Sequence, residues 1–175
     1  MRLSKKWAWS FLLMVLPTLV VAATDGSAMV NYSGTLVALP CTIEPGTEDI
    51  YIDMGEVPNK SLNSYTRLPG KLVEFELKDC DVSLGNMITV LPTGKTNALG
   101  LLKFDQGSTA SGAVIRLETL NGIPLIINVP HSISIIENGD MTIRLMAVLQ
   151  HDPLDSNDIV VGEYTATLNF AFNYE

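Results

Sequence analysis

The chain ends with the stretch Gly162-Glu163-Tyr164-Thr165-Ala166-Thr167-Leu168-Asn169-Phe170-Ala171-Phe172-Asn173-Tyr174-Glu175. Side chains of a β-strand alternate between two faces, so residues two apart share one face. This pattern therefore predicts a strand with one buried face, either a central core strand or an edge strand that something else must cover. The residues that share the apolar face are Tyr164, Ala166, Leu168, Phe170, Phe172 and Tyr174.

The same short-period pattern recurs along the chain without long helical stretches between. Asn121-Gly122, a strong hairpin signal, separates two of the apolar runs. Many short strands joined by turns predict an all-β, antiparallel sandwich or barrel. Residues 59–70 and 94–112 are polar or glycine-rich, and we expect loops or short edge pieces there. The remaining predicted strands are 28–36, 50–54, 73–77, 87–91, 114–120, 125–129 and 143–149.

The first 23 residues have the layout of a secretory signal peptide. Arg2, Lys5 and Lys6 precede an apolar run from Trp7 to Val21, and small residues follow at the expected cleavage point. The run is shorter than the roughly 20 residues that a membrane-spanning helix needs. An uncleaved anchor is the alternative. We expect residues 1–23 to be removed, after Ala22 or Ala23, and the mature chain not to be embedded in a membrane.

The mature chain is strongly acidic. Without the three basic residues of the leader, eight Lys and Arg remain against 19 Asp and Glu, a formal net charge of −11. Binding to nucleic-acid phosphates needs a basic surface, so the composition argues against a nucleic-acid partner.

The mature chain has two cysteines, Cys41 and Cys80. An even count in an exported chain predicts one disulfide, which chain-entropy arguments value at roughly 3–4 kcal/mol for this loop. Free thiols and metal ligands are the alternatives. A zinc site needs four ligands, and only His131 and His151 are available to complete one, without a characteristic spacing.

No pattern in the sequence indicates catalysis or a cofactor. Neither histidine lies in a recognisable acid–base arrangement. The acidic turn from Asp152 to Asp158 lacks the spacing and the glutamate of an EF-hand. We therefore expect no enzyme activity, no metal and no cofactor.

Several ordered features together resemble the pilin-type subunits of bacterial chaperone–usher fimbriae. Gly162 is fourteenth from the end and Tyr174 is penultimate, as in that family. The resemblance covers residues 24–175, without the additional front domain of a tip adhesin, and is closest to type 1-like minor subunits. The segments that carry it are the alternating arm Ala28–Leu36, Pro40-Cys41-Thr42-Ile43, Leu77-Lys78-Asp79-Cys80, Ala110–Leu117, Asn121–Leu125 and Gly162–Phe170.

The resemblance implies a fold and a mechanism. Members of the family are immunoglobulin-like sandwiches that lack their last strand, so a hydrophobic groove stays open beside the C-terminal strand. A periplasmic chaperone fills this groove with one of its own strands, and its basic residues hold the terminal carboxylate, here that of Glu175. At the outer-membrane usher, the N-terminal arm of the next subunit replaces the chaperone strand. The resemblance thus implies an adhesive fimbria on the cell surface.

The resemblance also assigns segments and residues. It implies a signal peptide at 1–23, an N-terminal donor-strand extension at 24–40 and a pilin domain at 41–175. The bulky Tyr32 departs from the usual arm pattern, which would affect the choice of acceptor. The expected donor residues are Ala28, Val30, Tyr32 and Gly34, and the expected chaperone and groove residues are Gly162, Tyr164, Leu168, Phe170, Phe172, Tyr174 and Glu175.

Two other functions stay open on sequence alone. A secreted β-sandwich could bind a ligand through its loops without polymerising. A secreted β-sandwich enzyme is the third reading, and the absence of a catalytic pattern counts against it.

Overall fold

The computed structural model describes residues 26, 28–44, 46, 48–65 and 67–175. It divides the chain into two units, one up to Leu36 and one from Val37 to Glu175. In the first unit, the described residues run without a helix or strand and their side chains are exposed. The predicted signal peptide, residues 1–23, lies outside the described residues.

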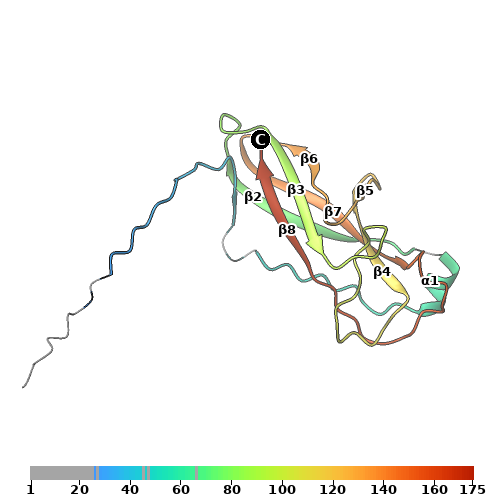
Figure 1. The fold of residues 1–175 in the computed structure, drawn as a ribbon. Coiled ribbons are helices and arrows are strands. Elements are labelled where there is room, and N and C mark those ends of the chain that lie inside the picture. Colours follow the sequence, from blue (N-terminus) through green and yellow to red (C-terminus); the bar gives the residue numbers. More distant parts are fainter. Residues whose placement is uncertain (1–25, 27, 45, 47, 66) are drawn as a thin grey trace, which may run out of the picture. The chain divides into compact units, whose positions relative to one another are not determined.

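The second unit is almost entirely β-structure (Figure 1). The prediction of an all-β, antiparallel fold is confirmed, since every strand pair among the described residues runs antiparallel. The elements are β1 (Thr42–Ile43), α1 (Asn59–Tyr65), β2 (Lys71–Cys80), β3 (Met87–Gly94), β4 (Ala113–Thr119), β5 (Pro124–Leu125), β6 (His131–Ile135), β7 (Gly139–His151) and β8 (Leu168–Tyr174).

Two sheets form the sandwich. The larger has the strand order β1-β2-β7-β4-β5, and the smaller has the order β6-β3-β8. In the larger sheet Val73 lies opposite Leu145, and in the smaller sheet Val90 lies opposite Phe172. Strands that follow each other in sequence are often placed in different sheets, so the fold depends on long-range pairing.

The core lies between the sheets and is built from the alternating positions of several strands. Leu77 and Leu145 come from the larger sheet, while Ile88 and Val90 come from the smaller one, and each is at most 1% exposed. Full burial of such a side chain stabilises the fold by about 1.5–3 kcal/mol. The period-two pattern therefore identified Leu77 and Leu145 as inward-facing, whereas residues 87–91 form a nearly continuous apolar run whose inward face alternation did not identify.

The segments expected to be loops contain more structure than the sequence indicates. Residues 59–65 form the short helix α1, which buries Leu62 against a second apolar cluster. The segment between β3 and β4 makes isolated bridges, including Leu102 with Ile115 and Ser111 with Val160. The polar composition of these segments does not predict the helix or the bridges, because each depends on contacts with distant parts of the chain.

The predicted disulfide is present between Cys41 and Cys80, 39 positions apart. It joins Cys41, the residue before β1, to Cys80 at the end of β2, next to the pairing of Thr42 with Lys78. Both cysteines are buried, at 1% and 5% exposed. The bond thus ties the residue before β1 to the last residue of β2.

Candidate functional site

The C-terminal strand β8 lies at an edge of the smaller sheet. It pairs with β3 on one side, and no other described strand pairs with it (Figure 1). An edge strand presents a row of main-chain N–H and C=O groups that can pair with another chain. The structure therefore selects the edge-strand interpretation of the C-terminal pattern.

Side-chain exposure alternates along the C-terminal segment. From Glu163 to Asn173 every odd-numbered residue is exposed. The even-numbered residues are all half-buried, and none of them reaches the full burial of the core: Tyr164, Ala166, Leu168, Phe170, Phe172 and Tyr174. This face contacts the core but is not fully covered by the described part of the chain.

The hydrogen-bond pattern shows which main-chain groups point to the open side. Met87 and Glu175 exchange both main-chain bonds, at 3.0 and 3.1 Å. In an antiparallel pair, hydrogen-bonded positions alternate with positions that make no bond to the partner. It follows that the odd-numbered residues of β8 bond to β3. The N–H and C=O groups directed away from β3 belong to Leu168, Phe170, Phe172 and Tyr174.

An aromatic cluster lies beneath the open edge. The ring of Phe75 in β2 contacts Phe170 and Phe172 edge-on, with centroids 4.7 and 5.1 Å apart. Its neighbours on the same face, Val73 and Leu77, are buried, whereas Phe75 is half-buried. The three rings thus form a partly uncovered apolar floor between the two sheets.

Residues 48–58 contribute a second group of apolar side chains to this region. The segment has no helix or strand, yet Ile52 packs on the same core cluster as Phe170 and Phe172. Met54 and Val57 pack on the second cluster together with Tyr164. The half-buried, even-numbered side chains from Tyr164 to Tyr174 form an apolar stripe. Residues 48–58 therefore pack on the same clusters as this stripe.

The structure corrects the predicted start of the C-terminal strand. Gly162 and Tyr164 precede β8, which begins at Leu168. Tyr164 stacks on Phe104 with ring centroids 4.3 Å apart, away from the cluster around Phe75. Burial and, to a smaller extent, the charge of Asp53 raise the pKa of the Tyr164 hydroxyl. The first half of the predicted strand forms main-chain hydrogen bonds with the loop between β3 and β4 and is not part of a sheet.

The C-terminal residue is anchored to the turn before β3. The terminal carbonyl oxygen of Glu175 accepts hydrogen bonds from the N–H groups of Asn86 and Met87, at 2.7 and 3.0 Å. Burial raises the pKa of Tyr174. The Glu175 carboxylate, which we expect a chaperone to bind, thus already accepts two hydrogen bonds from the protein's own main chain through one of its oxygens.

The four expected donor residues belong to the first unit. There Ala28, Val30, Tyr32 and Gly34 are exposed and lie outside any strand. Their pairing with an acceptor stays a prediction. Sequence reasoning overlooked Phe75 and Ile52 as site residues, although Phe75 is the one aromatic residue in the alternating run of β2.

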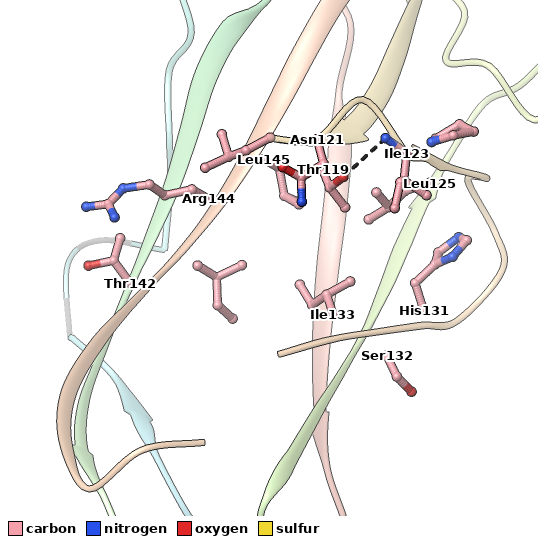
Figure 2. Close-up of a pocket in the computed structure, with 13 residues that line it drawn as sticks. Thr119, Asn121, Ile123, Leu125, His131, Ser132, Ile133, Thr142, Arg144 and Leu145 are labelled. Carbon is pink, nitrogen blue, oxygen red and sulfur yellow. Dashed lines mark hydrogen bonds between the residues drawn. The ribbon is translucent and has the colours of Figure 1, made fainter. Parts of the chain in front are cut away.

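A separate cleft of about 500 Å³ lies between the β4–β5 hairpin, β6 and β7 (Figure 2). Many of its polar groups are already bonded within the protein. Thr119 Oγ1 accepts a hydrogen bond from the Ile123 N–H, and Nε2 of His131 lies 2.8 Å from the Ile126 carbonyl oxygen. Arg144 donates to Glu74 at 2.7 Å. We assign no ligand to this cleft.

Within the described ranges, no group of three His, Cys, Asp or Glu residues is arranged to hold a metal ion. In the same part of the chain, no helix combines the length and apolar character needed to cross a membrane.

Comparison with known proteins agrees with this architecture. The chain is 27% identical to the fimbria A protein of Serratia marcescens over the whole of both chains. It is 30% identical to the fimbrial-like protein YfcP of Escherichia coli K12, over 82% of each chain.

Among solved structures, the P pilus rod subunit PapA superposes with a TM-score of 0.68 at 18% identity, covering 78% of this chain and all of that one. A chaperone–usher pilus structure gives 0.69 at 20% identity, covering 86% and 97%. The fold is thus the immunoglobulin-like fold of pilins. A family profile described as fimbrial protein matches residues 30–175, and the chain belongs to this family as a structural subunit of a fimbria.

Proposed function

We propose that this subunit is assembled by strand donation at the open edge of β8. A strand from another molecule adds beside β8, and its alternate side chains cover the half-buried apolar stripe. Main-chain pairing then provides affinity, while the side chains provide specificity.

A single observation carries this proposal. Leu168, Phe170, Phe172 and Tyr174 direct both their free main-chain groups and their incompletely covered side chains to the same site. An added strand satisfies both requirements at once, because each of its residues brings a backbone group and every second residue brings a side chain. A ligand that contacts only side chains would leave the edge unpaired.

The assembly route follows the family mechanism. A periplasmic chaperone lends the first strand, and at the outer-membrane usher the segment 24–40 of a neighbouring subunit replaces it. Ala28, Val30, Tyr32 and Gly34 are the donor residues that face the stripe. The product is a surface fimbria that contributes to cell adhesion, and the subunit itself is not an enzyme.

The test is the dependence of folding on an added strand. The mature chain, with residues 24–36 deleted, is purified alone and in the presence of a peptide of residues 24–36. We expect aggregation or low stability alone, and a cooperative unfolding transition at higher denaturant concentration with the peptide. A deleted chain that is soluble, monomeric and highly stable alone would contradict strand donation and favour a non-polymerising binding module.

A further inference from the structure

The strand β3 continues past the end of its neighbour β6. Within β3, the even-numbered residues direct their main-chain groups away from β8, because Met87 and the other odd-numbered residues bond to β8. On that far side β6 reaches only to Val90, which lies opposite the first residue of β6, His131. The main-chain groups of Pro92 and Gly94 on the far side therefore need another partner.

A single residue from the connection between β5 and β6 is this partner. The Asn128 N–H donates to the Pro92 carbonyl at 2.7 Å. The side-chain Oδ1 of Asn128 accepts from the Gly94 N–H at 3.2 Å, and its Nδ2 donates to the Gly94 carbonyl at 3.1 Å. Because proline has no N–H, these bonds satisfy the main-chain groups of both residues on the far side. Asn128 thus takes the place of a strand beside the end of β3.

The turn that contains Asn128 does not by itself require an asparagine. Asn128 has a left-handed backbone, with φ 68°, at the third position of a turn that the Val129 N–H closes on the Ile126 carbonyl at 3.3 Å. Glycine adopts this conformation at least as readily. The neighbouring Ile127 is only 3% exposed and anchors the turn in the protein. The contribution that is particular to the asparagine side chain is therefore its pairing with Gly94.

The end of β3 that Asn128 holds also carries the first half of the β8 edge. Gly94 lies opposite Leu168, and Pro92 lies opposite Phe170. The second half of β8 lies opposite the part of β3 that β6 supports. If the end of β3 loses its partner and frays, Leu168 and Phe170 lose the support that keeps them in the sheet.

We propose that Asn128 is a positioning residue for strand donation, which holds Leu168 and Phe170 ready to receive a donor by clamping the end of β3 from its far side. This inference rests on the proposed function. Both β3 and β8 lie between Asn128 and an added strand, so Asn128 acts through β3 and not by contact with the donor. Its replacement should therefore affect Leu168 and Phe170 more than Phe172 and Tyr174.

Amide hydrogen exchange at single-residue resolution tests this inference. The mature chain is mixed with excess peptide of residues 24–36, and we expect new protection at Leu168, Phe170, Phe172 and Tyr174 in the wild type. Asn128→Gly keeps the turn but removes the two side-chain hydrogen bonds. We expect about tenfold faster exchange at Gly94 and at Asn169, the β8 residue that bonds to β3 next to it, with no change at Asn173. Protection by the peptide should fall at Leu168 and Phe170 and persist at Phe172 and Tyr174.

Two further variants and three outcomes decide the matter. Asn128→Asp still accepts from the Gly94 N–H but cannot donate to its carbonyl, so it should show a smaller effect. Asn121→Gly removes an exposed amide from the turn between β4 and β5, and it should match wild type. Unchanged exchange at Asn169 in Asn128→Gly would overturn the positioning role. Equally faster exchange along all of β8 would also overturn it, because that result indicates a general loss of stability. If the peptide protects no residue of wild-type β8, strand donation itself fails, and this inference fails with it.

Discussion

The ring of Phe75 lies edge-on to the ring of Phe170, with centroids 4.7 Å apart and planes at 61°. Phe75 belongs to β2 of the larger sheet and Phe170 to β8 of the smaller sheet. This contact connects the two layers at the place where β8 has an unpaired edge. The strength of strand donation should therefore depend on it.

Replacement of Phe75 by alanine should weaken the complemented subunit. The change removes the aromatic floor and leaves a cavity, and for this half-buried ring we expect a loss of roughly 2–4 kcal/mol in the free energy of unfolding. Denaturant unfolding with saturating donor peptide measures it. Phe75→Leu keeps most of the apolar volume and should cost less. Equal midpoints for wild type and Phe75→Ala would show that the ring does not support the site.

Charges on the inward face of the arm should block polymerisation. Val30→Asp with Tyr32→Asp would place carboxylates over an apolar stripe, where an unpaired charge is strongly disfavoured. Fimbria formation should be lost, while the chaperone complex persists because the chaperone supplies its own strand. Asn31→Asp with Ser33→Asp is the matched control, with equal charge on the outward face.

If the Val30 and Tyr32 variant instead loses chaperone binding, the arm must be part of the folded core. Co-purification of subunit and chaperone from the periplasm, compared with fimbriae on the cell surface, separates the two outcomes.

Truncation of Tyr174 should reduce pairing at the end of the acceptor edge. Its side chain is half-buried on the core cluster, and burial raises its pKa. We expect Tyr174→Ala to lower subunit levels in the periplasm, since an unpaired subunit is exposed to degradation. Tyr174→Phe keeps the ring and should stay near wild type, and Asn173→Ala on the exposed face is a second control. Normal levels of Tyr174→Ala would rule out a contribution of this side chain.

Removal of the disulfide should destabilise the subunit. The Cys41–Cys80 bond closes a loop of 39 positions, for which loop-closure entropy predicts a loss of roughly 3–4 kcal/mol when both residues become serine. Thermal unfolding of the peptide-complemented chain with and without reductant measures the effect. The unfolding temperature of the double serine variant should not change with reductant. If the unfolding temperature of the wild type does not change either, the disulfide does not stabilise the subunit.

Much of this architecture could be predicted from the local sequence. Alternation identified the inward faces of Val73, Leu77 and Leu145, and the exported context predicted the disulfide. The sequence missed α1, because Leu62 gives that segment a buried anchor only when the second apolar cluster is assembled. It also placed Gly162 within a strand, although the backbone there pairs with a loop some 50 positions earlier.

By itself, the sequence determined which side chains of the C-terminal segment share a face, because period-two geometry follows from the backbone alone. Only the tertiary structure decided that Leu168 to Tyr174 forms an edge strand, since this depends on which strands lie beside it. It likewise decided that Phe75 lies beneath the edge and that Gly162 meets Thr109. Such neighbours are set by long-range packing between the two sheets, and no local pattern encodes them.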